Sequence, residues 1–120
     1  MLKFISILNN TEFRSSTRTT PEFLSFYRTF MADMKRTLKP RITAFEMHKG
    51  HFYAYGFFRT NSNRMFYFSI SDVRYFPESS MLIRTVKDFR DFTGGCNQYV
   101  KMDNDFEQNL MKLLDFHEPM

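Results

Sequence analysis

The sequence predicts an α+β fold: an antiparallel sheet of about five strands, flanked by an N-terminal and a C-terminal helix. Three observations lead to this prediction. An apolar stripe of helical period follows Thr20, alternation with a period of two begins at Arg41, and a second helical stripe follows Asp103. The connections between the alternating segments are short, which favours a meander.

The first helix is expected at residues 21–39. Thr20 supplies a capping hydroxyl, Pro21 suits the first helical position, and Glu22 lies near the positive end of the helix. Pro40 ends the helix because the residue before a proline disfavours helical backbone angles. Apolar residues recur along one face at Phe23, Phe26, Tyr27, Phe30, Met34 and Leu38.

The sheet is expected at residues 41–102. Lys49-Gly50 marks the first turn, and Asn61-Ser62-Asn63 marks the second because Asn tolerates left-handed backbone angles. Pro77 ends any extension of the third strand. The predicted strands are 41–48, 51–59, 64–71, 81–86 and 96–102.

The whole chain, residues 1–120, is expected to form one domain. Residues 1–20 are expected to form an N-terminal segment with a basic, Ser/Thr-rich loop. A final helix is expected at 103–117, with Asp103 or Asp105 as its cap. Cys96 is the only cysteine, which excludes an intrachain disulfide and fits a reducing compartment. The sequence contains no signal peptide and no apolar run of membrane-spanning length, so we expect a cytoplasmic protein that uses no membrane and no cofactor.

Two neighbouring predicted strands carry aromatic residues on both faces. One face is apolar and is expected to form the core, with Phe52, Phe58, Phe66, Phe68 and Ile70. The opposite face mixes rings with hydroxyl and charged groups, and a tyrosine there can stack on a nucleobase while its hydroxyl stays hydrated. If one helix covers each face, however, these tyrosines are half-buried spacers. The residues of this second face are Tyr53, Tyr55, Phe57, Arg59, Tyr67, Ser69 and Ser71.

Charge is distributed unevenly along the chain. The net charge is +4, but residues 1–102 hold 16 of the 17 lysines and arginines and eight of the 13 acids. A basic body of this kind keeps a domain soluble or faces a polyanion. Arg41 is expected to extend the basic surface. The predicted binding residues are Tyr53, Tyr55, Phe57, Arg59, Arg64, Tyr67, Arg84, Lys87, Arg90 and Lys101.

No catalytic motif is present, and we expect a protein that is not an enzyme. His48 and His51 flank a turn but are too few for a metal site. A nuclease using a divalent ion is an alternative, with Asp72, Asp88 or Asp91 as ligands.

The loop at residues 87–95 mixes charges of both signs with Phe89 and Phe92. If those rings point outward, the loop is a recognition element. If they point inward, it is an ordinary packed loop.

The strings FSISDVRYF at 68–76, LIRT at 82–85 and DFTGGCNQYV at 91–100 resemble small proteins carried by phages and other mobile elements. That resemblance implies a context in which such proteins bind nucleic acid or inhibit a host defence, anti-CRISPR proteins among them. It assigns no role to any residue.

Two functions therefore stay open from the sequence. The first is a non-enzymatic nucleic-acid-binding protein that prefers single strands. The second is a phage-encoded, anti-CRISPR-like inhibitor that binds a host nucleic-acid-processing protein, since exposed aromatics and arginines also favour protein interfaces. A homodimer through an edge strand such as 96–102, or through an aromatic face, is compatible with either function.

Overall fold

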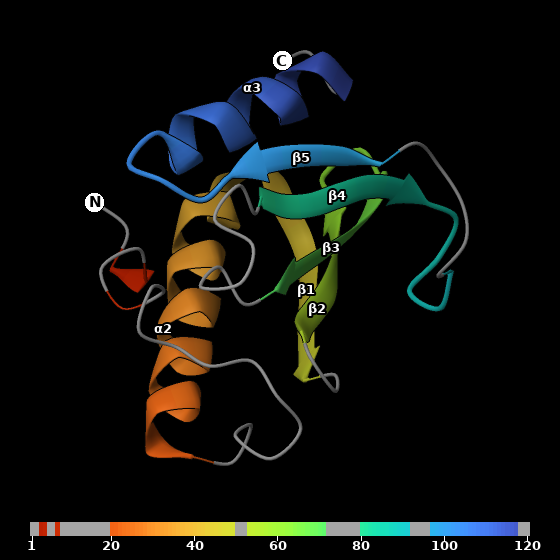
Figure 1. The fold of residues 1–120 in the computed structure, drawn as a ribbon. Helices are drawn as coiled ribbons and strands as arrows, with labels where there is room; N and C mark the ends of the chain where they lie inside the picture. Colours follow the sequence, from red (N-terminus) through yellow and green to blue (C-terminus); the bar gives the residue numbers. More distant parts are fainter. Residues whose placement is uncertain are drawn as a thin grey trace.

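The computed structural model confirms the α+β class, with a five-stranded sheet that follows one helix and precedes another (Figure 1). It describes Lys3, Phe4, Ile7 and residues 20–49, 53–71, 80–91 and 97–117, except for the side chains of Tyr53, Ser71 and Ser80. The elements are α2 (Pro21–Leu38), β1 (Ile42–Lys49), β2 (Tyr53–Thr60), β3 (Met65–Ser71), β4 (Ser80–Val86), β5 (Gln98–Lys101) and α3 (Phe106–His117).

Helix α2 begins where the sequence indicates. The Thr20 hydroxyl accepts a hydrogen bond from the backbone N–H of Phe23 at 3.3 Å. This bond satisfies one of the donors that the first helical turn leaves unpaired. The helix ends at Leu38, and Pro40 lies in a short 3₁₀ turn, Lys39–Arg41, that leads into β1.

The sheet is the predicted meander. The strands follow one another in the order β1-β2-β3-β4-β5, and each neighbouring pair is antiparallel. Phe58 lies opposite Phe66 with their rings stacked 5.1 Å apart, and Gly56 lies opposite Phe68. Asn63 in the β2–β3 turn has φ 70°, the left-handed conformation that the sequence predicts for an Asn turn.

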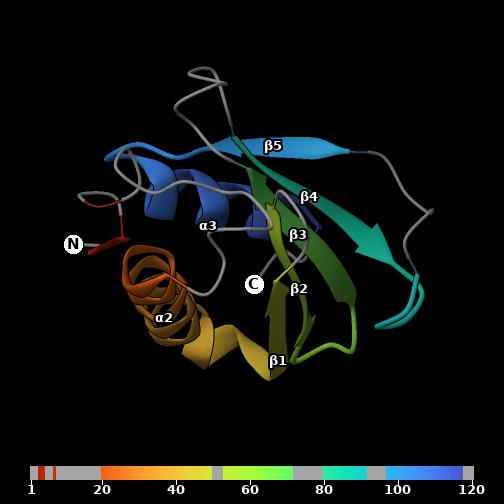
Figure 2. The same cartoon turned by 60° about the horizontal axis from the view of Figure 1, so that its bottom comes forward.

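Both helices pack against the same face of the sheet, as two views show (Figures 1 and 2). A single apolar cluster contains their buried side chains together with those of all five strands. The alternative with α2 and α3 on opposite faces is therefore wrong. The helical contribution to this core is Phe23, Phe26, Phe30, Met34, Leu38, Phe106, Leu110 and Leu114, and the strands add Met47, Ala54, Phe58, Phe66, Phe68, Ile70, Met81, Ile83 and Val100.

Phe4 joins the two helices. Its ring lies edge-on to Phe30 of α2 at 4.6 Å and to Phe106 of α3 at 5.3 Å. Its backbone N–H donates to the buried carboxylate of Asp33 at 2.8 Å, and the second carboxylate oxygen pairs with Arg36. Both oxygens of this buried charge therefore have partners, which offsets the cost of taking it out of water.

The last helix starts later than predicted. It begins at Phe106, because the two preceding acids form a turn instead of a helical first turn. The Asp103 carboxylate accepts from the Asp105 N–H at 2.9 Å, and the Asp103 carbonyl accepts from the Phe106 N–H at 3.0 Å. Short Asp side chains favour such local bonds over continued helix.

The strand boundaries move by one or two residues from prediction. The largest change is β5, which spans Gln98–Lys101 instead of 96–102. Most of the N-terminal segment at 1–20, together with Phe52 and Cys96, lies outside the described residues.

Gly56 is a position where only glycine fits. An added Cβ would lie 2.3 Å from the backbone oxygen of Glu46 and 2.6 Å from Cζ of Phe68. The oxygen belongs to the paired strand β1, so it cannot move without disturbing the ladder. Gly56→Ala should lower the free energy of unfolding by about 1–3 kcal/mol, measured by urea denaturation. Thr43→Ala on the exposed side of β1 should cost less than about 0.5 kcal/mol, and equal urea midpoints for the two variants would contradict this account.

Candidate functional site

The face of the sheet opposite α2 and α3 carries no helix of the described chain. The register of the strands places its side chains in rows that cross the sheet. We call this surface the helix-free face. Its three rows are Ala44, Arg59, Met65 and Val86; Glu46, Phe57, Tyr67 and Arg84; and His48, Tyr55, Ser69, Leu82 and Tyr99.

Two predicted stacking residues in the middle row are buried. Phe57 is 1% exposed and Tyr67 is 8% exposed. Phe89, from the loop after β4, stacks on Phe57 with 5.5 Å between ring centroids, and the Arg84 guanidinium lies over the Tyr67 ring at 4.4 Å. The alternation therefore gives the correct face for both rings, but the expectation that they are open to solvent does not hold. Their neighbours cover them in the absence of a helix.

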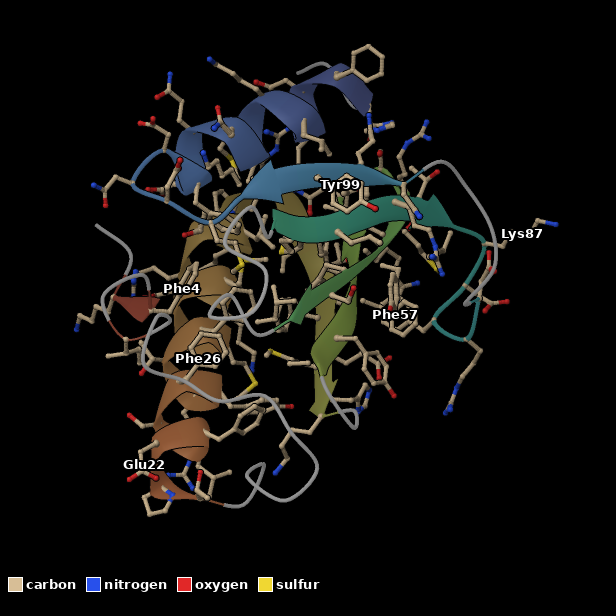
Figure 3. The ribbon with its side chains drawn as sticks, viewed as in Figure 1. Phe4, Glu22, Phe26, Phe57, Lys87 and Tyr99 are labelled. Atoms are coloured by element: carbon tan, nitrogen blue, oxygen red, sulfur yellow. The ribbon has the colours of Figure 1, made fainter. Side chains whose placement is uncertain are left out.

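Other rings on this face are more accessible. Tyr55 is half-buried, with His48 at 5.3 Å and Tyr67 at 6.2 Å between ring centroids. Tyr99 on the edge strand β5 is 61% exposed (Figure 3), and the sequence-based list of binding residues omits it. Its position next to the buried Val100 is the signal that places it on this face, since neighbours along a strand point to opposite sides.

Arg59 and Arg84 lie on the aromatic layer with part of each guanidinium withdrawn from water. Arg84 covers Tyr67, and the guanidinium of Arg59 lies 6.0 Å from the Phe89 ring. The Nε atom of each arginine is buried and has no hydrogen-bond partner. Within the described part of the chain neither side chain pairs with a carboxylate. The two arginines therefore hold desolvated donors on this face, which is a costly arrangement unless an acceptor is supplied.

A groove of about 530 Å³ continues the first row at the end of the sheet. It lies between the β2–β3 turn and the segment that follows β4, and Met65 and Val86 line it from the sheet. Arg64 and Lys87, both exposed, contribute its positive charges. Its remaining lining residues are Ser62, Asn63, Thr85 and Asp91.

The loop beside the groove is held by its own acids. The Asp91 carboxylate accepts from the Lys87 backbone N–H at 3.1 Å, and the Asp88 carboxylate accepts from the Arg90 N–H at 2.8 Å. Two of the three acids considered as nuclease ligands, Asp88 and Asp91, therefore shape the loop. The sequence left open whether the rings of this loop point inward or outward. Phe89 packs inward against Phe57, as in an ordinary packed loop, and Phe92 lies outside the described residues.

The structure does not gather all the predicted cations. Arg90 is exposed on the loop, while Lys101 is exposed on β5 opposite the start of β4, at the far end from Lys87. Arg41 pairs with Asp115 of α3 at 2.8 Å, which draws it to the helical side of the sheet. Arg41 is therefore not part of the basic surface that the sequence predicts.

A metal site does not emerge from the described ranges. They contain no group of three or more His, Cys, Asp or Glu side chains that are close enough to hold an ion. His48 pairs with Glu46 of the neighbouring row, whereas His51 and Asp72 lie outside the described residues.

Comparison with known proteins assigns the chain to no family, because no protein-family model, curated protein or solved structure matches it. Among the described residues, neither helix combines the length and the apolar character needed to cross a membrane.

The packing of Phe89 on Phe57 predicts how the loop responds to mutation. Phe89→Ala removes the stacked ring and should destabilise the loop by about 1–2 kcal/mol. Trypsin should then cleave faster at Lys87 and Arg90, followed by mass spectrometry, because local opening limits proteolysis. Phe116→Ala, which removes a ring that is 77% exposed on α3, should leave these cleavage rates unchanged. Unchanged rates in Phe89→Ala would mean that the stack does not hold the loop.

Proposed function

We propose that the protein binds single-stranded nucleic acid along the helix-free face and catalyses no reaction. The observation that supports this most directly is a pair of half-buried arginines over the rings of this face, Arg59 and Arg84, which pair with no carboxylate in the described part of the chain. A phosphate oxygen is an acceptor that a guanidinium binds well, because its planar fork matches the phosphate geometry.

The spacing of the two arginines favours a polyanion over a single anion. Arg59 is on β2 and Arg84 on β4, so they are two strands and one row apart. Two strand spacings are about 10 Å and one row is about 7 Å along the strand. A flexible chain with a phosphate at every nucleotide supplies an acceptor to each arginine in its present position, beside Phe89 or over Tyr67.

The distribution of charged residues favours the helix-free face as the side on which a nucleic acid binds. Acids are concentrated in the last 18 residues, 103–120, and α3 lies on the opposite face of the sheet. Arg64 and Lys87 line the groove at the end of the helix-free face instead, and Arg90 is exposed on the adjoining loop. A nucleic acid approaching that face meets net positive charge, which steers association and releases counterions.

The aromatic residues then have two different roles. Phe57 and Tyr67 are buried, so they support the cations above them and do not stack on bases. Base stacking falls to Tyr99, with the half-buried Tyr55 in the same row. Binding of this kind depends mainly on phosphate contacts and tolerates any sequence.

Binding to a host protein is the second candidate, and Phe116 favours it. This ring is 77% exposed on α3, away from the helix-free face. Large exposed rings of this kind are typical anchors of protein interfaces. An inhibitor of a host defence nuclease would fit both this ring and the resemblance to phage proteins.

Charge removal at the two arginines tests the proposal. We expect the wild-type protein to bind an oligothymidylate at low salt, with affinity that falls as salt rises. Arg59→Gln and Arg84→Gln should each lower affinity and reduce the slope of log affinity against log salt by about 0.7. Arg28→Gln, on the exposed side of α2, should change neither quantity. Absence of binding at low salt, or an equal effect of Arg28→Gln, would refute the proposal.

Tyr99 gives a second, independent prediction. Tyr99→Ala should weaken oligothymidylate binding by about 1–3 kcal/mol, measured by fluorescence anisotropy, because one base–aromatic stack is lost. Tyr99→Phe retains the ring and should bind within about twofold of wild type. Phe116→Ala should have no effect on this affinity. If Phe116→Ala weakens binding and Tyr99→Ala does not, the interface lies on α3 instead.

A further inference from the structure

The groove at the end of the helix-free face is continuous with the proposed binding surface. Met65 and Val86 line the groove and also belong to the first row, which includes Arg59. Beyond this row the sheet ends in the β2–β3 turn, and the loop after β4 follows the same edge. A bound strand that crosses the rows towards this end of the sheet therefore reaches the groove where the surface terminates.

The lining of the groove suits a phosphate more than a base. Among the residues that the structure describes, no aromatic ring lines it, so this part of the lining offers nothing for stacking. Its cations are Arg64 and Lys87, and its hydroxyl and amide groups come from Ser62, Asn63 and Thr85. Its volume of about 530 Å³ is within the range of small-molecule sites and accommodates a phosphate with its sugar.

The two cations match a terminal phosphate better than an internal one. An internal phosphodiester carries one negative charge, whereas a phosphate monoester carries about −1.5 to −2 at neutral pH. The monoester also has one more terminal oxygen to accept hydrogen bonds. Asp91 is the only acid among the described lining residues, and its carboxylate accepts from the Lys87 backbone N–H. That acid weakens, but does not cancel, the positive charge of the groove.

We propose that this groove binds the terminal phosphate monoester of a single strand, so that the protein prefers phosphorylated ends. This inference rests on the proposed function, because it assigns to the groove the end of the same strand. It predicts that one strand terminus lies beside Arg64 and Lys87, with the chain continuing over Arg59 and Arg84.

The test compares oligothymidylates that differ only at their ends. Affinities are measured by anisotropy, with an internal label, for strands with a 5′-phosphate, a 3′-phosphate or hydroxyls at both ends. One phosphorylated strand should bind about five- to tenfold more tightly than the hydroxyl strand. A preference for either phosphorylated end supports the inference and identifies the polarity. Equal affinity of all three strands overturns it while leaving the proposed function intact. No binding of any strand overturns both.

Variants assign the preference to the groove. Arg64→Ala and Lys87→Ala, both at exposed positions, should reduce the affinity ratio of phosphorylated to hydroxyl strand towards one. Asp91→Asn keeps an acceptor for the Lys87 N–H and removes the negative charge, so it should raise the ratio. Lys101→Ala, at the far end of the sheet, should lower both affinities equally and leave the ratio unchanged. A ratio that survives both Arg64→Ala and Lys87→Ala would place the phosphate elsewhere and overturn the inference.

Discussion

The fold depends on one shared layer of packing: both helices bury their apolar stripes against the same face of a sheet that carries rings on both sides. Phe4 completes this layer, because its ring contacts Phe30 of α2 and Phe106 of α3 together. Each fully buried large side chain contributes about 1.5–3 kcal/mol, so the layer supplies most of the driving force for folding. The constraint that follows is on the other face, which must shield its rings without either of these helices.

On the helix-free face, a loop residue and an arginine shield the rings from water. Phe89 covers Phe57, and Arg84 covers Tyr67. Arginine suits this use because its guanidinium is planar, weakly hydrated and attracted to ring faces. The same contact removes Nε from water without giving it an acceptor. Packing on this face therefore leaves two positive charges that no described carboxylate neutralises, and the proposed polyanionic ligand would neutralise them.

Sequence reasoning identifies the faces but not their exposure. The strict period of two in a strand separates Phe57 and Tyr67 from Phe58 and Phe66 with no knowledge of the tertiary structure. Burial of Phe57 depends on Phe89, whose position is set by a loop far along the chain. Likewise, the apolar stripe of a helix shows that the helix packs against an apolar surface, but it does not show which face of the sheet provides that surface. Only the three-dimensional structure shows that α2 and α3 pack on the same face. The start of α3 depends instead on a local effect: the short Asp103 side chain bonds to the nearby backbone and so competes with the first helical turn. The spacing of apolar residues along the helix carries no information about that competition.

The covered rings also change what kind of recognition this surface supports. If Phe57 and Tyr67 were open, several bases would stack in succession, and affinity would depend strongly on stacking. With those rings buried, the binding that we propose relies mostly on contacts to phosphates, which position a strand without reading its sequence. A surface of that kind distinguishes ligands by the number and spacing of their charges. The end of a strand, where charge is greatest and the chain stops, is then the one feature that such a surface can recognise specifically.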